Sequence, residues 1–268
     1  MPDADPPPDA LRHRDLLVAT VREAGQLALQ AFGQQPKTWT KDGGSPVSEA
    51  DLAVNALLHD RLRPAAPDVG WLSEESIDEP KRLTTPHVWI VDPIDGTRAF
   101  LAQWPDWCVS VALVADGRPV LAAVYVPVAD EMFVAVRGAG ATLNGARLHI
   151  TDAVGLEGAR AAGPQRFLRA LAPSGIAPVP RVNSLALRLA RVAQGTLEVA
   201  FAFRDSHDWD LAAADLLVHE AGGVMTTFAG SPVIYNRVDP VHDALIAAGR
   251  RRHATVLGVI KDQPAAFA

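Results

Sequence analysis

Apolar residues recur at helical spacing near the start of the chain. Over residues 16–31 they follow the three- and four-residue steps of one helix face, and Gly33 suits the left-handed backbone that ends a helix. A second helical stripe follows Ser48-Glu49-Ala50-Asp51, which has the form of a capping box, and it continues until Pro64. The pattern therefore predicts two amphipathic helices before residue 65.

From residue 88 the sequence pattern changes to short apolar runs rich in β-branched residues. These runs predict strands at 88–91, 107–115, 120–126 and 131–136, with turns at Asp116-Gly117 and Asn144-Gly145. We expect the strands to form one largely antiparallel sheet. Beyond about residue 151 a different alternation begins, which favours a second α/β layer: a helix over 185–192, a strand near 196–201 and a helix over 209–221.

Composition narrows the classes of function. The 25 Lys and Arg against 31 Asp and Glu give a formal charge of -6, so the basic footprint of a duplex nucleic-acid binder is missing. Cys108 is the only cysteine, which excludes an intramolecular disulfide and a multi-cysteine zinc site. No apolar run approaches the roughly 20 residues that span a bilayer. We expect a cytoplasmic protein that binds neither nucleic-acid polymers nor membranes.

Carboxylates concentrate where an apolar strand ends, in Trp-Ile-Val-Asp-Pro-Ile-Asp-Gly-Thr at 89–97. Asp92 and Asp95 flank a stiff proline, so both carboxylates and the Ile94 carbonyl can converge on one point, and hard oxygen ligands suit Mg²⁺. The amides of Gly96 and Thr97 could open a short helix that receives a phosphate. The alternative is a turn built from favoured turn residues.

Further acidic residues have a structural and a chemical interpretation. Glu74 and Glu75 follow an apolar run and suit either the same site or a solvated loop. Asp210 falls in the first turn of a helix, where an acid also interacts favourably with the helix dipole. Asp51 completes the cap begun by Ser48. If Glu74, Asp210 and the two strand-end aspartates converge, repulsion raises their pKa values unless divalent cations compensate.

Competing catalytic motifs are weak. The sequence contains no zinc-protease histidine pair, no nucleophile elbow and no Walker loop. Gly138-Ala139-Gly140 lacks the third glycine of a dinucleotide-binding loop, and Leu143-Asn144-Gly145 after it is typical of a hairpin.

The two strongest motifs resemble the signatures of inositol monophosphatases: residues 89–97 and Trp-Asp-Leu-Ala-Ala-Ala-Asp at 209–215. Supporting segments occur in family order at 45–51, 72–76 and 220–223. The resemblance covers nearly all of the chain after residue 12, and it implies a layered αβαβα sandwich. With this fold we expect a disordered tail at 1–12, an N-terminal α+β part at 13–150 with the metal-binding motifs, and a C-terminal α/β part at 151–268 that completes the active site.

The resemblance also implies the site and its chemistry. Two or three Mg²⁺ ions would activate water for in-line attack on a small phosphorylated substrate, and lithium would inhibit. A monomer and a homodimer stay open. Carried over residue by residue, the resemblance implies that Asp51 and Thr97 orient the attacking water and that Glu75 supports the metal shell. The phosphate would contact Asp95, Asp210 and the amides of Gly96 and Thr97. The implied metal ligands are Glu74, Asp92, the Ile94 carbonyl, Asp95 and Asp210.

The shared motifs leave several substrates open. Phe203 stands seven residues before Asp210, where inositol enzymes tend to place a ligand-binding Glu, although a short gap would bring Arg204 or Asp205 there. With Leu72-Ser73 and Tyr235-Asn236 this favours a 3'(2'),5'-bisphosphate nucleotidase that converts 3'-phosphoadenosine 5'-phosphate to AMP.

Three alternatives to the nucleotidase remain. They are an inositol-1-monophosphatase or other sugar phosphatase, a histidinol phosphatase, which Arg98-Ala99-Phe100 keeps open, and a non-catalytic metal-binding regulatory protein. Candidates for contact with the organic part of the substrate are Lys41, Ser184, Phe203, Arg204 and His207.

Overall fold

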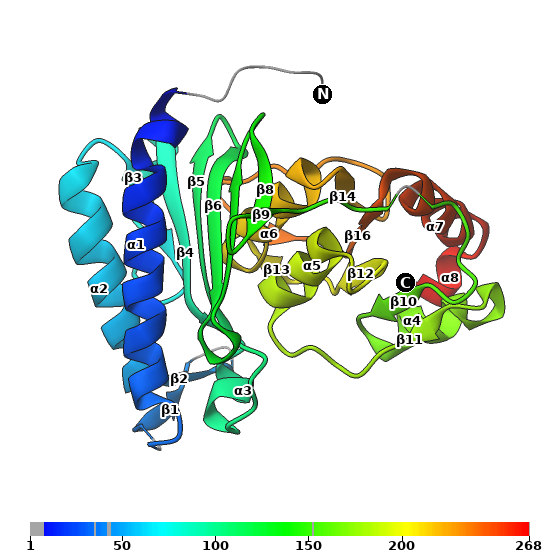
Figure 1. Cartoon of the computed structure of the whole chain (residues 1–268), viewed down its shortest axis with the longest axis horizontal. Helices are drawn as coiled ribbons and strands as arrows, with labels where there is room; N and C mark the ends of the chain where they lie inside the picture. The colour runs from blue at the N-terminus through cyan, green and yellow to red at the C-terminus, as the bar shows by residue number, and fades with distance from the viewer. Residues whose placement is uncertain (1–7, 35, 42–43, 152, 268) are drawn as a thin grey trace.

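Layers of helix and sheet alternate through the molecule (Figure 1). The computed structural model describes residues 8–34, 36–41, 44–151 and 153–267. A helical layer of α1 (Pro8–Ala31) and α2 (Glu49–Ala65) covers the outer face of a first sheet. Helices α5 (Leu185–Gln194) and α6 (Asp208–Glu220) lie between this sheet and a second one. A third helical layer on the far face of the second sheet completes the αβαβα sandwich, as the sequence predicted.

Within the described residues, seven strands form the first sheet in the order β3-β4-β5-β6-β7-β8-β9. The β3–β4 pair is parallel and the other pairs are antiparallel, which confirms the expected topology. The strands are β3 (Gly70–Ser73), β4 (His87–Asp95), β5 (Cys108–Ala115), β6 (Arg118–Val126), β7 (Glu131–Val136), β8 (Gly140–Leu143) and β9 (Ala146–Arg147).

The middle of this sheet is covered on both faces. Successive residues of β5 pack into different clusters, Val111 against the outer helices and Ala112 against the inner ones. A strand buried on both sides has no polar face, which explains the continuous apolar runs in the sequence. The outer helix α1 lies close to β6 at Gly25, where an added Cβ would stand only 2.3 Å from the Tyr125 ring.

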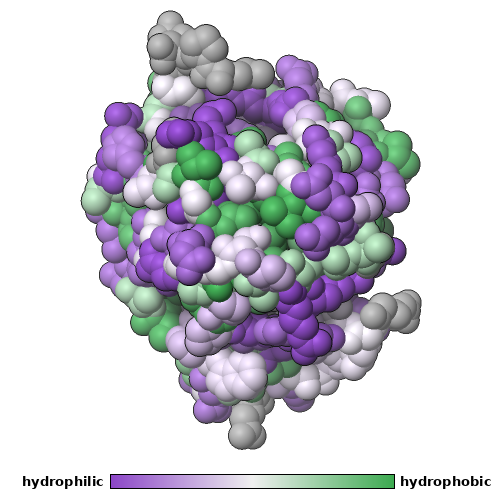
Figure 2. All heavy atoms as spheres, turned by 90° about the vertical axis from the view of Figure 1, so that its right-hand side faces the viewer, coloured by the Kyte–Doolittle hydropathy of each residue, from purple (hydrophilic) through white to green (hydrophobic). Residues whose placement is uncertain are grey.

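The second sheet follows the order β11-β10-β12-β16-β14 among the described residues. Strand β10 is parallel to both neighbours, whereas β12, β16 and β14 pair antiparallel. Figure 2 shows this end of the molecule, where hydrophilic side chains are interspersed with smaller hydrophobic areas. The elements are β10 (Arg160–Ala162), β11 (Ala177–Pro178), β12 (Val199–Ala202), β14 (Gly223–Thr227) and β16 (Leu245–Gly249), with outer helices α4 (Gln165–Leu171), α7 (Arg250–Asp262) and α8 (Pro264–Phe267).

Short elements complete the chain. Two small ribbons pair β1 (Thr38–Thr40) with β2 (Pro46–Ser48) and β13 (Ser206–His207) with β15 (Val241–His242). Helix α3 spans Thr97–Leu101, and 3₁₀ turns lie at Pro80–Thr84, Pro127–Ala129 and Ala172–Ser174. No helix in the described ranges is both long enough and apolar enough to cross a membrane.

Two helix boundaries differ from the sequence prediction. Helix α1 begins at Pro8, so residues 8–12 are helical rather than part of a disordered tail; residues 1–7 lie outside the described ones. Proline favours the first helical position, and Ala10 is fully buried. Helix α2 continues through Pro64 to Ala65, because a proline in the last turn removes only one helical hydrogen bond. The division of the chain near residue 150 stays an interpretation.

Candidate metal centre

Three aspartates from distant parts of the chain converge at one point. Asp92, Asp95 and Asp210 each offer one carboxylate oxygen, and these oxygens lie within 4.8 Å of one another. Asp92 is 1% exposed and Asp95 is 7% exposed. Such spacing suits the ligands of a hard divalent cation, which prefers carboxylate oxygens. The structure thus brings together three of the residues that the sequence identified as metal ligands.

Local structure fixes the direction of each carboxylate. Strand β4 pairs with β5 up to Asp92, and the register then shifts before Asp95, so a bulge separates the two aspartates. Asp210 is the third residue of α6, and its carboxylate accepts a hydrogen bond of 2.6 Å from the backbone N–H of His207. The capping geometry that the helix dipole favours therefore also points Asp210 at the cluster.

One oxygen of Asp95 is held by the start of α5. The Ser184 hydroxyl donates to Asp95 Oδ2 at 2.6 Å and the Ala186 N–H at 2.5 Å, while Ser184 also caps its own helix. Ser184, a substrate-contact candidate in the sequence, is thus placed where it orients a carboxylate.

Asp92 is the most unusual of the three. Both of its carboxylate oxygens are buried and neither has a hydrogen-bond partner among the described residues. The pKa of Asp92 is raised well above its ordinary value, chiefly by burial and next by the charge of Glu74. A buried carboxylate without donors is costly, and protein structures pair such groups or bind them to metal. The donor set therefore fits a divalent cation.

The pKa values of Asp95 and Asp210 are also raised. Burial raises the pKa of Asp95 to about 6, and burial together with the charge of Asp95 raises the pKa of Asp210 well above its ordinary value. Carboxylates that share a low-dielectric site disfavour one another's ionisation. A bound cation reverses that penalty, because metal binding requires the ionised form.

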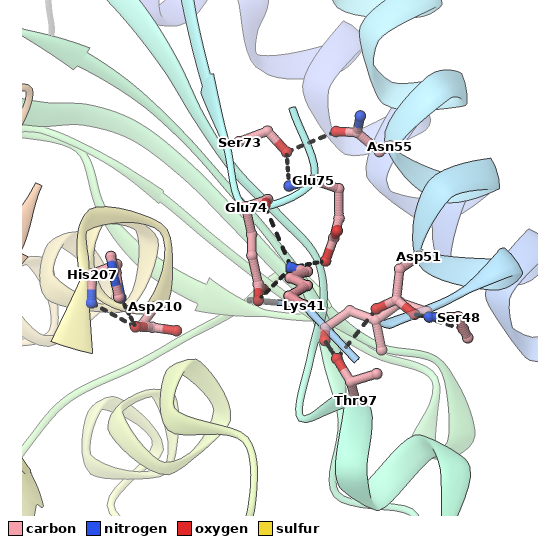
Figure 3. Close-up of polar contacts among 11 residues, drawn as sticks. Lys41, Ser48, Asp51, Asn55, Ser73, Glu74, Glu75, Thr97, His207 and Asp210 are labelled. Atoms are coloured by element: carbon pink, nitrogen blue, oxygen red, sulfur yellow. Dashed lines mark hydrogen bonds and ion pairs between the residues drawn. The ribbon is translucent and has the colours of Figure 1, made fainter. Parts of the chain in front are cut away.

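Glu74 and Glu75 follow β3 and share one partner, as Figure 3 shows. Lys41 Nζ contacts Glu74 Oε1 at 3.0 Å and Glu75 Oε1 at 2.6 Å. The lysine comes from the loop between β1 and β2, and both acids lie close enough to raise its pKa despite its partial burial. Burial raises the pKa of Glu75 to about 7. The lysine ammonium thus offsets the charge of one of the two glutamates.

The carboxylate of Asp51 accepts a hydrogen bond from the Thr97 hydroxyl. Asp51 is 1% exposed, and its Oδ2 accepts hydrogen bonds from the backbone N–H and the hydroxyl of Ser48. Its Oδ1 accepts from the Thr97 hydroxyl at 3.2 Å, and that hydroxyl also lies 3.1 Å from the Ile94 carbonyl. The cap on α2 that the sequence predicted therefore coexists with a contact to the strand-end motif (Figure 3).

Gly96 makes this motif possible. Its φ of 94° is left-handed, and an added Cβ would approach the Asp106 carbonyl at 3.2 Å and Ser184 at 3.3 Å. The next residue, Thr97, begins α3, so the short helix predicted after Gly96 is present. A left-handed glycine at this point lets the chain turn sharply beside Asp95.

Two other substrate-contact candidates, His207 and Phe203, lie between β12 and α6. His207 precedes the helix and stacks on Trp209 with ring centroids 4.5 Å apart. Phe203 is 39% exposed and lies under the Arg166 guanidinium. Sequence reasoning missed Asp208, which lies beside the motif yet contacts His242 rather than the cluster. No local pattern predicts the contact between Asp208 and His242, because the two residues are distant in sequence.

Comparison with known proteins gives this geometry a family. The model of the inositol monophosphatase family matches residues 12–264. The chain belongs to this family. The inositol-1-monophosphatase of Rhizobium meliloti is 34% identical over 263 residues, which cover 93% of this chain and 96% of that protein. Members of the inositol monophosphatase family are metal-dependent phosphomonoesterases, so the chain is a phosphoric monoester hydrolase.

Solved structures of the inositol monophosphatase family share the fold. The extragenic suppressor protein SuhB of Bartonella henselae has a TM-score of 0.82 and 30% identity, over 92% of this chain and 97% of that one. An IMPase/NADP phosphatase complexed with Mg²⁺ and phosphate has a TM-score of 0.80 and 25% identity, over 92% of this chain and 94% of that one. The sequence resemblance to the family is therefore confirmed.

Proposed function

We propose that the chain hydrolyses a small phosphate monoester with Mg²⁺ held by the acidic cluster. The ligands would be Asp92, Asp95, Asp210, Glu74 and the Ile94 carbonyl, and they would hold two or three ions. Bound Mg²⁺ would supply a Lewis acid for the phosphoryl oxygens and would lower the pKa of an attacking water. The donor set is all oxygen, which matches the preference of this cation.

The observation that carries the proposal is the orphaned carboxylate of Asp92. Its two oxygens are buried without donors, and one of them lies within 4.8 Å of carboxylate oxygens of two other aspartates. A purely structural role would leave an uncompensated acid in the core, since no described base contacts it. Divalent cations bound among them would compensate the three carboxylates.

The Asp51–Thr97 pair suits the proton chemistry of the reaction. The Thr97 hydroxyl donates to Asp51, so the hydroxyl oxygen can accept a hydrogen bond from an attacking water. Burial raises the pKa of Asp51, which keeps this carboxylate a stronger base than an exposed aspartate. The amides of Gly96 and Thr97 would contact the phosphate, as the resemblance implies.

The substrate proposed first is 3'-phosphoadenosine 5'-phosphate. Phe203 stands where inositol enzymes tend to carry a glutamate, and the Arg166 guanidinium lies 4.2 Å from the Phe203 ring centroid. Arg166 and Arg204 line a cavity of about 680 Å³, together with Arg237 and several acidic side chains. Because Arg204 is three residues before His207, its Cα lies within about 11 Å of the His207 Cα. These arginines suit a second phosphate.

Inositol 1-phosphate is the second candidate. The observation that favours it is the similarity to the inositol-1-monophosphatase of Rhizobium meliloti, which extends over 93% of this chain. An inositol enzyme would have to bind the sugar hydroxyls without a glutamate at position 203, using Asp205 or backbone groups instead.

Phosphate release from three substrates tests these alternatives. The substrates are 3'-phosphoadenosine 5'-phosphate, inositol 1-phosphate and histidinol phosphate, each with Mg²⁺ and with a chelator. Chelator-sensitive turnover that favours the bisphosphate supports the nucleotidase, and preference for another substrate replaces it. Mg²⁺ binding without release from any of the three would favour a non-catalytic regulatory protein.

A further inference from the structure

A buried arginine connects the loop that carries Glu74 with a second segment, which in turn contacts the start of α6. Arg82 lies in the 3₁₀ turn at Pro80–Thr84 and is 1% exposed. Its guanidinium makes four hydrogen bonds, to Asp78 on one side and to Asn236 and Arg237 on the other. A buried guanidinium persists only when its donors are satisfied, so the partners of Arg82 constrain both segments.

The first segment is the loop that follows β3. Arg82 Nε and Nη2 donate to the two oxygens of Asp78 at 2.6 and 2.8 Å, a bidentate pair. Asp78 lies three residues after Glu75 in this loop, which begins with Glu74. The bidentate geometry fixes both the distance and the plane of the carboxylate.

The second segment lies between β14 and β16. Arg82 Nη1 donates to Asn236 Oδ1 at 2.7 Å and to the Arg237 carbonyl at 3.0 Å. Asn236 adopts a φ of 56°, and this left-handed backbone directs its N–H to Asp208 Oδ2 at 2.7 Å. Asparagine tolerates this conformation better than most residues. Asn236 therefore connects Arg82 to Asp208 through hydrogen bonds.

Asp208 is the first residue of α6, and its side chain is fully buried. Its Oδ1 lies 2.6 Å from His242 Nε2, and its backbone N–H donates to the Pro240 carbonyl at 2.9 Å. Asp210 follows two residues later in the same helical turn. The contacts of Asp208 thus fix where the first turn of α6, and with it Asp210, stands relative to the rest of the chain.

We propose that Arg82, Asn236 and Asp208 are positioning residues that set the distance between the Glu74 loop and Asp210. Glu74 follows the first sheet, whereas Asp210 lies on a helix between the two sheets, so no local geometry relates them. Metal ligands must stand within about 0.2 Å of their ideal distances. A fully satisfied polar network is rigid enough to hold two elements in this way. The inference rests on the proposed metal site.

A purely stabilising network would behave differently. Its loss would lower the thermal midpoint but leave metal affinity unchanged in the protein that remains folded. A positioning network couples directly to the ligands, so Mg²⁺ affinity and kcat should fall at temperatures well below unfolding. The measurement must therefore separate metal affinity from stability.

Asn236→Gly tests the inference, because glycine keeps the left-handed backbone and its N–H but removes the acceptor for Arg82. Asn236→Asp restores an acceptor. The matched control is Asn144→Gly, since Asn144 also has a left-handed φ of 48° and accepts a backbone hydrogen bond, but in the β8–β9 turn. Titration calorimetry of the metal-free proteins with Mg²⁺ at 25 °C gives affinity without a substrate, and kcat is measured at saturating substrate.

We expect Asn236→Gly to weaken Mg²⁺ binding about tenfold and to lower kcat, whereas Asn236→Asp and Asn144→Gly stay within about twofold of the parent. Asp78→Asn, at a side chain that is 44% exposed, provides a milder variant and should weaken binding about threefold. Parent-like Mg²⁺ affinity in Asn236→Gly and Asp78→Asn would overturn the positioning role. If the parent itself binds no Mg²⁺, the proposed metal site fails instead.

Discussion

Asp92 and Asp210 lie on different layers of the sandwich, yet their carboxylate oxygens stand within 4.8 Å of each other. Asp92 is the last residue of β4 before the register shift in its pairing with β5, and Asp210 lies in the first turn of α6, which packs on that sheet. Two acids this close need a compensating charge, and no described base contacts Asp92. The metal hypothesis, and most of the predictions below, follow from this proximity.

Asp92→Asn should stabilise the metal-free protein while it abolishes Mg²⁺ binding. The amide removes a buried charge that has no donor, so the free energy of unfolding in chelator at pH 8 should rise by about 1–3 kcal/mol. Chemical denaturation in EDTA measures the first effect and titration calorimetry the second. A destabilised variant that still binds Mg²⁺ would show that Asp92 has protein partners instead.

Asp95→Asn should lose metal affinity and turnover together, each by at least about 100-fold. Ser184 and Ala186 donate to Oδ2 of Asp95, so the amide must also break one of these hydrogen bonds or rotate. Asp60→Asn is the control, because the Asp60 side chain is 79% exposed and lies on α2. Full turnover in Asp95→Asn would remove Asp95 from the site.

Thr97→Val should lower kcat about 10²- to 10³-fold while Mg²⁺ affinity stays close to that of the parent. Valine keeps the shape of threonine but loses the hydroxyl that contacts Asp51 and the Ile94 carbonyl. Thr97→Ser retains the hydroxyl and should keep most of the activity. Equal losses in both variants would indicate packing rather than proton chemistry.

Mg²⁺ affinity should increase from pH 5 to pH 8. The pKa of Asp95 is raised to about 6 and that of Glu75 to about 7, chiefly by burial, and the metal binds ionised carboxylates. Both folded-state pKa values exceed the ordinary ones, so these groups favour the folded metal-free protein below about pH 4. That contribution is lost as pH rises through the range of about 6 to 7.

Thermal unfolding in chelator and calorimetry at several pH values check both trends. Saturating Mg²⁺ should raise the thermal midpoint more at pH 8 than at pH 5. The variant Glu75→Gln removes one of the two groups and should flatten the stability trend of the metal-free protein between pH 6 and 7. An affinity for Mg²⁺ that does not depend on pH would mean that these carboxylates are already ionised at pH 5.

Lithium at millimolar concentration should inhibit turnover. The inositol monophosphatase resemblance implies that this small cation replaces a weakly held Mg²⁺ after the leaving group departs. Phosphate release is measured at increasing LiCl, with NaCl at the same ionic strength as the control. Activity that LiCl leaves unchanged would count against a weakly held ion in this chain.

The sequence by itself determined the local structures that carry the chemistry. Three of these features depend on neighbouring residues: the capping box of Ser48 and Asp51, the two aspartates around Pro93, and the early position of Asp210 in α6. Backbone conformation over a few residues follows from side chains within that distance, so patterns of spacing predict it. The layered fold was equally readable through its resemblance to a known family.

Only the tertiary structure decided which of these groups meet. Lys41 bridges Glu74 and Glu75, and Arg82 reaches Asn236 from 154 residues away. Such contacts depend on how two sheets pack around α5 and α6, which no local pattern encodes. For the same reason the sequence did not indicate the contact between Asp208 and His242. Proximity across a fold results from the packing of whole elements, so it had to be observed.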